Sequence, residues 1–117
     1  MGKDGDYVLG THDAEIGRLH LQHGIWRDHV HDCWRRAGIR SGQRVIDIGC
    51  GPGFASADLA KLTGPAGRVY GIERSARFIE YADALCRGND LHNVQFQQAD
   101  VMLEALDATG CDAAWCR

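Results

Sequence analysis

Long apolar runs and an excess of either charge are both missing from this sequence of 117 residues. No apolar stretch approaches the roughly 18 residues that a membrane-spanning helix needs, and residues 1–10 lack the apolar core of a signal peptide. The formal net charge of −3 provides no basic surface for nucleic acid or an anionic membrane. These absences predict a cytoplasmic protein of roughly one domain that binds neither nucleic acid nor a membrane.

Paired cysteines are also absent. The five cysteines form no C-x-x-C pair and their number is odd, which argues against a disulfide framework and fits a reducing cytoplasm. We interpret them as structural thiols, because free cysteine is commonly buried as a small apolar residue. They are Cys33, Cys50, Cys86, Cys111 and Cys116.

Two helices are predicted in the first 40 residues. The first covers 12–23 and is interrupted by Gly24, and the second covers 25–37 and ends at a left-handed cap on Gly38. The apolar residues of the second helix share one face: Trp26, Val30, Cys33, Trp34 and Ala37. We interpret residues 1–40 as a helical lead-in or lid.

After residue 42 the pattern changes to alternating strands and helices. The predicted strands are 44–48, 68–72, 93–97 and 112–116, and the predicted helices are 54–62, 75–87 and 102–107. This alternation indicates a Rossmann-like open α/β sheet that is mainly parallel, with flanking helices. The sequence stops one residue past the fourth strand, which leaves an unprotected edge. We therefore expect an N-terminal fragment whose sheet is truncated.

The strongest functional motif is VIDIGCGPG at residues 45–53, where three glycines join a strand to a helix. Open parallel sheets bind ligands at the carboxyl ends of their strands. The G-x-G-x-G spacing differs from the G-x-G-x-x-G of dinucleotide sites, and Pro52 removes one amide donor. Asp47 would repel a phosphate. The loop therefore favours a positively charged ligand, with a nicotinamide dinucleotide as the alternative.

Two further acids follow the next two strands. Glu73 follows strand 68–72, where an acid can accept hydrogen bonds from both ribose hydroxyls of an adenosine. A nicotinamide site uses an acid there too, so Glu73 indicates a ribose without separating the two hypotheses. Asp100, between Ala99 and Val101, can accept from an adenine amino group that its apolar neighbours flank, or it can simply cap the next helix.

Four segments in this order resemble the first four sequence motifs of class I S-adenosylmethionine-dependent methyltransferases: VIDIGCGPG, VYGIERS, VQFQQADV and CDAAWCR. The match covers residues 40–117. The stretch from Tyr7 to Gln22 is similar to the lead-in helix of small-molecule methyltransferases of the ubiquinone and menaquinone biosynthesis type. The resemblance implies S-adenosyl-L-methionine as cofactor, a small organic methyl acceptor and a seven-stranded fold. Residues 41–117 would form its incomplete cofactor-binding half.

The resemblance also implies roles for individual residues. The methionine end of the cofactor would be held by Asp47 and the backbone of Gly49, Cys50 and Gly51, with Gly53 completing the loop. The ribose would be held by Glu73 with Arg74 beside it, and the adenine by Asp100 and Val101. The backbone around Cys116 and Arg117 would close over the methionine amino group, and Tyr7 and Gln22 would line the methionine side.

The catalytic residues are not identified by the sequence. His23, His29 and His31 are candidates for a general base because they precede the fold as a lid helix would, but solvated surface histidines are the simpler interpretation. On a helix His29 and His31 point to different faces. The pairs His20–His23 and His29–Cys33 could each share a face, but two ligands fall short of the three or four that a zinc site needs, so no metal site is predicted. A non-catalytic methyltransferase-like interaction module stays a third hypothesis.

Two other residue types can be interpreted either as structural or as functional. Trp26 and Trp34 could stack on an aromatic acceptor, but their helical spacing favours core or interface packing. Cys50 could be a catalytic thiol, but a small structural residue is expected inside such a loop. The sequence carries no signal for an oligomeric state.

Overall fold

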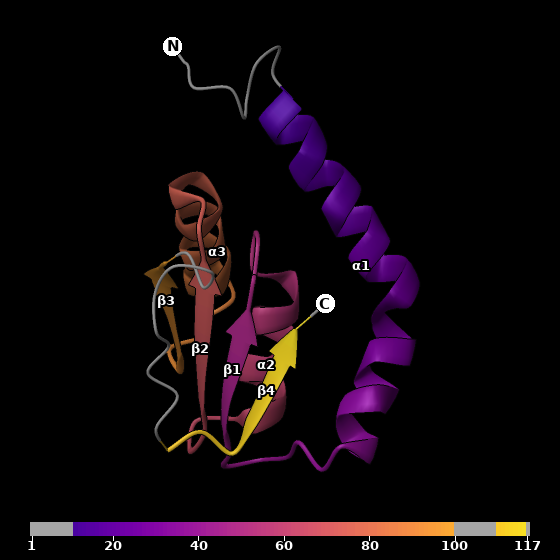
Figure 1. Ribbon diagram of the computed structural model, residues 1–117, viewed down its shortest axis with the longest axis vertical. Helices are drawn as coiled ribbons and strands as arrows, with labels where there is room; N and C mark the ends of the chain where they lie inside the picture. Colours follow the sequence, from indigo (N-terminus) through magenta and orange to yellow (C-terminus); the bar gives the residue numbers. More distant parts are fainter. Residues whose placement is uncertain (1–10, 100–109, 117) are drawn as a thin grey trace.

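A single parallel sheet organises the chain, in a computed structural model that describes residues 11–99 and 110–116. The strand order is β3-β2-β1-β4 (Figure 1). The strands are β1 (Arg44–Ile48), β2 (Arg68–Glu73), β3 (Val94–Gln98) and β4 (Ala113–Cys116), and the helices are α1 (Thr11–Arg36), α2 (Phe54–Thr63) and α3 (Ala76–Gly88). The predicted Rossmann-like α/β fold is confirmed.

The strand order reverses beside β1. The chain moves outward from β1 through β2 to β3 and then returns to the other side of β1 as β4. Ile48 at the end of β1 lies opposite both Ile72 and Cys116, so the three strands end at the same level. Ligand sites in open parallel sheets form where the order reverses at this edge. The loop after β1 occupies that position.

One continuous helix, α1, stands where two were predicted. Gly24 does not interrupt it, because a glycine inside a helix costs only about 1 kcal/mol relative to alanine, and contacts on both sides of it hold the helix against α2. The predicted cap is confirmed: Gly38 has a φ of +86°, and the Ile39 amide donates to the carbonyl of Trp34.

The core lies between the sheet and the helices on one of its faces. Trp34 is only 1% exposed and packs edge-to-face on Trp115 of β4, with 5.5 Å between ring centroids. Trp26 is 54% exposed, and Cys33 and Ala37 are exposed as well, so the predicted apolar face is wrong at these three positions. The main cluster consists of Val30, Trp34, Ile39, Val45, Ala55, Leu59, Ala60 and Val69.

Most of the predicted boundaries agree with the structure to within one residue. Ser75 caps α3 as predicted, because its side chain accepts a hydrogen bond from the Phe78 amide. Ala82 and Cys86 form the buried stripe of that helix. The predicted helix 102–107 lies outside the described residues.

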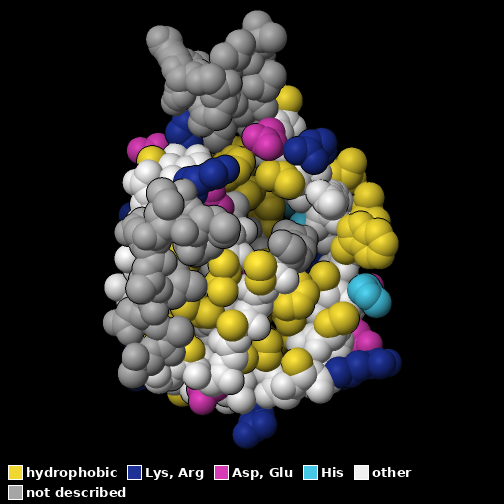
Figure 2. All heavy atoms as spheres, in the orientation of Figure 1, with side chains coloured by type: hydrophobic (Ala, Val, Ile, Leu, Met, Phe, Trp, Pro, Cys, Tyr) yellow, Lys and Arg dark blue, Asp and Glu magenta, His cyan; other side chains and the backbone are white. Residues whose placement is uncertain are grey.

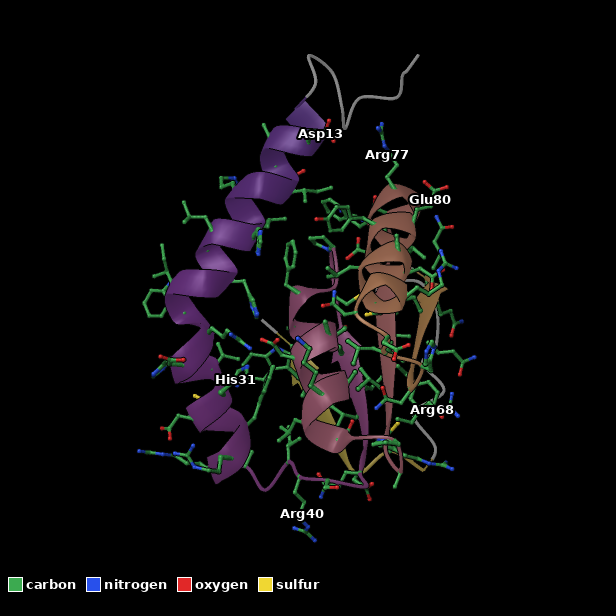
Figure 3. The ribbon with its side chains drawn as sticks, turned by 180° about the vertical axis from the view of Figure 1, so that it is seen from behind. Asp13, His31, Arg40, Arg68, Arg77 and Glu80 are labelled. Carbon is green, nitrogen blue, oxygen red and sulfur yellow. The ribbon has the colours of Figure 1, made fainter. Side chains whose placement is uncertain are left out.

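The described helices share one side of the sheet, with α1 packed along α2 (Figures 1 and 3). Figure 3 shows α1 as a separate arm beside α2 and α3, with His31 near its lower half. In the described part of the chain, no helix combines the length and apolar character needed to cross a bilayer.

Candidate functional site

Every N–H group of the glycine loop between β1 and α2 forms a hydrogen bond within the protein. Pro52 has no N–H, and the other four loop residues each donate to a neighbouring oxygen. These bonds are Gly49 N to Ile72 O (2.8 Å), Cys50 N to Ile72 O (3.0 Å), Gly51 N to Glu73 Oε1 (2.9 Å) and Gly53 N to Cys50 O (3.1 Å). A phosphate needs free N–H groups. Residues 49–53 therefore offer no free N–H group to a phosphate, and the Glu73 carboxylate beside them suits a ligand that donates hydrogen bonds.

The shape of this loop depends on glycine. Gly49, Gly51 and Gly53 have φ angles of +69°, +56° and +90°, in a region that L side chains rarely adopt. A Cβ on Gly53 would also lie 2.6 Å from the Cβ of Ala82 in α3. The close approach of α3 therefore fixes the start of α2 and, with it, the end of the loop.

Glu73, the last residue of β2, is tied to the loop by both of its carboxylate oxygens. Oε1 accepts from the Gly51 amide, and Oε2 accepts from the Ser75 amide at 2.9 Å. A carboxylate offers about four lone-pair sites, so these two bonds leave capacity for further donors. The side chain is half-buried, so a ligand at the loop can reach it.

Asp47 places a second carboxylate beneath the same loop. Its side chain is 3% exposed, and Oδ2 accepts from the hydroxyl of Ser56 at 2.6 Å. Burial, together with the charges of Asp47 and Glu73, raises the pKa of the Cys50 thiol well above its ordinary range. The thiol therefore stays protonated, and the structural interpretation of Cys50 is supported over a catalytic one.

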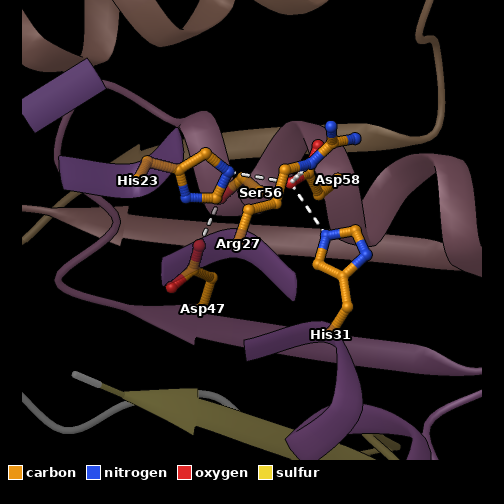
Figure 4. A network of polar contacts seen from close by, with 6 residues as sticks. All are labelled: His23, Arg27, His31, Asp47, Ser56 and Asp58. Atoms are coloured by element: carbon orange, nitrogen blue, oxygen red, sulfur yellow. Dashed lines mark hydrogen bonds and ion pairs between the residues drawn. The ribbon is translucent and has the colours of Figure 1, made fainter. Parts of the chain in front are cut away.

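A polar cluster that the sequence did not predict joins α1 to α2 (Figure 4). Three side chains of α1 converge on Oδ2 of Asp58: His23 Nε2 at 2.8 Å, Arg27 Nε at 3.1 Å and His31 Nε2 at 2.9 Å. We call these four residues the Asp58 cluster. Burial alone would raise the pKa of Asp58, but the bonds from the two histidines and the charge of Arg27 outweigh burial and hold that pKa well below its ordinary value.

The predicted solvated histidines are wrong at one position. His29 is exposed, His31 is half-buried and His23 is only 6% exposed. The reason is Asp58, which lies 35 residues away in the sequence and gives the His23 ring a buried partner. A signal was present: positions 23, 27 and 31 repeat every four residues and share one helical face. Their partner could not be identified without the tertiary contact.

Aromatic rings meet where the loop enters α2. Phe54, the first residue of α2, is stacked by His20 at 4.6 Å between centroids and is met edge-on by Tyr81 at 5.9 Å. The His23 ring lies 6.1 Å from Phe54. Figure 2 shows a hollow beside α1 at this end of the sheet, lined by hydrophobic side chains with a histidine visible inside it. The site is thus walled by α1 on one side and the loop on the other.

The other predicted site residues that the structure describes are all exposed. Arg74 is exposed, and its carbonyl accepts from Gln98; Cys116 is exposed at the end of β4; Gln22 is exposed on α1. The predicted roles of Asp100, Val101, Tyr7 and Arg117 lie outside the described residues. No group of three His, Cys, Asp or Glu side chains within residues 11–99 and 110–116 is arranged to hold a metal ion.

The fold and the loop together define a class: an open parallel α/β domain with a glycine loop flanked by two carboxylates at the point where the strand order reverses. Residues 39–112 match the family model described as "Methyltransferase domain". This match covers more than half of the chain, and the chain belongs to that family.

Individual relatives agree with this assignment. The demethylmenaquinone methyltransferase of Lactococcus lactis subsp. lactis is 32% identical over 81 residues, which is 69% of this chain and 31% of that protein. A SAM-dependent methyltransferase from Aquifex aeolicus has a TM-score of 0.67 at 26% identity, over 74% of this chain and 46% of that one. Coclaurine N-methyltransferase, solved with N-methylheliamine and SAH, has a TM-score of 0.65 at 29% identity, over 88% and 27%. The chain spans about a third of the length of the curated relatives it matches.

Proposed function

We propose that this chain forms the cofactor-binding half of a methyltransferase that transfers a methyl group from S-adenosyl-L-methionine to a small organic acceptor. The observation that carries the proposal is the loop of residues 49–53, whose amide donors are all occupied or absent and which lies between the carboxylates of Asp47 and Glu73. Such a site suits a cationic ligand that bears hydroxyl groups, and it does not suit a pyrophosphate.

The proposed contacts follow the three strand ends. Asp47 and the carbonyl oxygens of residues 49–51 would hold the ammonium end of the cofactor, and Glu73 would accept from the ribose hydroxyls. The exposed Arg74 lies beside that ribose position. Asp100 and Val101 at the adenine, and the backbone near Cys116 over the methionine amino group, complete the proposal from sequence alone.

When bound, the cofactor supplies a methyl group on a positively charged sulfur that leaves readily. The residues of this chain orient that group and keep water from it, since alignment alone can supply several kcal/mol of rate enhancement. A base for the acceptor would act only where the acceptor loses a proton on methylation.

A small organic acceptor is supported by the names of the relatives. One is a demethylmenaquinone methyltransferase, and another was solved with N-methylheliamine. The formal net charge of −3 supports neither nucleic acid nor an anionic membrane as partner. The odd number of cysteines and the lack of a C-x-x-C pair in the sequence support the cytoplasm as location.

The proposal is tested by calorimetric titration of the chain with S-adenosylhomocysteine. Asp47→Asn and Glu73→Gln should each weaken binding by about tenfold or more, because each removes a charged hydrogen-bond acceptor. Asp83→Asn is the matched control, because Asp83 pairs with Arg87 on the exposed side of α3 and should leave affinity unchanged. Unaltered affinity in both site variants would refute the proposed contacts. Methylation by the intact gene product would then separate an enzyme from an interaction module.

A further inference from the structure

The outer face of α1 carries apolar side chains that are open to solvent in the described part of the chain. Leu21 is 67% exposed and Ile25 is 68% exposed, more than any other large apolar side chain there. They lie one turn apart, on the side of the helix opposite the buried His23 and Val30. Figure 2 shows hydrophobic side chains at the surface along this edge of the molecule. Exposed apolar patches of this kind mark interaction surfaces.

Two glycines form a notch in the same face. Gly17 and Gly24 leave a groove of about 420 Å³ beside Leu21 and Ile25. A Cβ on either glycine would meet no atom within 4 Å, and neither glycine has a positive φ. A glycine inside a helix costs about 1 kcal/mol relative to alanine. The protomer itself therefore gives no reason for glycine at these two positions, whereas a closely packed neighbour does.

The projecting side chains and the notches alternate along the helix. Positions 17, 21, 24 and 28 are separated by four, three and four residues, which is the spacing of a seam between two packed helices. In such a seam each projecting side chain fits into a gap of the partner helix. In an antiparallel pair whose two-fold axis lies between positions 22 and 23, Leu21 lies opposite Gly24 of the second copy, and the symmetry repeats this contact. The face is thus complementary to itself.

The charges on this face favour the antiparallel arrangement. Asp28 comes to lie opposite Gly17 of the second copy, next to its Arg18, and both charged side chains are exposed. Arg18 is 3.5 Å from Glu15 on its own helix, an exposed contact that leaves its other donors available. A parallel pair would instead place Asp28 beside Asp28 of the other copy, and like charges in an interface are unfavourable.

We infer that α1 is a dimerisation helix, and that two copies of this chain pair antiparallel through the notched face, with Leu21 over Gly24 and Asp28 beside Arg18. This inference does not depend on the proposed function. It gives α1 a second support, on the side opposite the Asp58 cluster. A stable dimer buries roughly 800 Å² on each partner, and one pair of helices offers less, so the dissociation constant should be about 10–100 μM. At the roughly 5 μM of an unfolding experiment the chain is then mostly monomeric.

Sedimentation equilibrium of the chain, at concentrations up to about 500 μM, measures the association. Leu21→Glu should weaken it by about tenfold or more, because the dimer would bury a charge without a partner. The matched control is Leu62→Glu, which changes a 40% exposed leucine on α2 and should leave the association unchanged. A wild-type chain that stays monomeric, or an equal loss in the two variants, would refute the inference. A monomeric chain that instead sediments with phosphatidylglycerol vesicles would assign the face to lipid.

Charge reversal tests the antiparallel register. Asp28→Arg and Arg18→Asp should each weaken association by about five- to tenfold, because the two-fold axis doubles the lost contact. The two changes together should restore it to within about twofold. Positions 18 and 28 lie about 15 Å apart along one helix, so this restoration arises only between copies. All the changed side chains are exposed, and circular dichroism checks that each variant is folded. Failure of the double variant to restore association would refute the antiparallel pairing.

Discussion

The glycine loop and helix α1 face each other across one site, but they are held in place differently. The loop is fixed by backbone bonds to the neighbouring strand β2, through Ile72 and Glu73. Helix α1, by contrast, makes polar contacts with α2 through three side chains that all bind one oxygen, Oδ2 of Asp58. The loop is therefore a rigid part of the sheet, whereas the position of α1 is sensitive to one carboxylate. The following predictions test this difference.

Removal of the Asp58 carboxylate should have the largest effect. Asp58→Ala leaves the buried His23 and the charge of Arg27 without their acceptor, which should lower the free energy of unfolding by about 3–5 kcal/mol. Urea denaturation measures the change. The control is Asp83→Ala, which breaks an exposed pair on α3 and should cost at most about 1 kcal/mol. Equal losses in the two variants would mean that Asp58 does not anchor α1.

The same substitution should have opposite effects in the two regions. Gly53→Ala forces a side chain into a φ of +90° and against Ala82, which should destabilise the chain by about 2 kcal/mol or more. Gly24→Ala meets open space inside α1 and should stabilise the chain by about 0.5–1 kcal/mol. Thermal unfolding of both variants gives the sign of each change in stability. A destabilising Gly24→Ala would show that α1 requires a close approach at that position.

The anchor of α1 should weaken in acid. The folded pKa of Asp58 lies below its ordinary value, so its contribution is complete above about pH 4, the ordinary pKa of an aspartate, and is lost as the pH falls toward the folded value. The difference in unfolding free energy between the wild type and Asp58→Asn should therefore shrink below about pH 4. Urea titrations at several pH values measure it. A difference that grows in acid would contradict the low pKa.

The smallest effect concerns thiol chemistry. Cys33 is exposed on α1, whereas Cys50 and Cys86 are buried. Burial, together with Asp83, raises the pKa of Cys86 to about 11, and the Cys50 thiol is shifted upward as well. Alkylation of the folded chain by iodoacetamide, followed by mass spectrometry, should label Cys33 before Cys50 and Cys86. Early labelling of Cys50 would mean that the loop opens readily.

The two regions also differ in how far the sequence predicts them. The loop is local: Asp47 and the three glycines lie within residues 45–53, so motif and spacing were enough to place them on one strand–turn–helix unit. Glu73 needed only the rule that parallel strands end at one edge. The partner of His23 lies 35 residues away on another helix, and periodicity cannot select it among the other acids. The predicted interruption of the helix at Gly24 is wrong for a related reason, since tertiary contacts outweigh a weak local propensity.

The central claim is that the loop has no N–H group left for a phosphate and therefore binds a ligand that donates hydrogen bonds. Its most direct test is a competition titration on the unmodified chain, in which bound S-adenosylhomocysteine is challenged with NAD⁺. The account predicts that S-adenosylhomocysteine binds and that NAD⁺ does not displace it, because residues 49–53 have no free N–H for a pyrophosphate. Displacement by NAD⁺, or tighter binding of NAD⁺ than of S-adenosylhomocysteine, would contradict it.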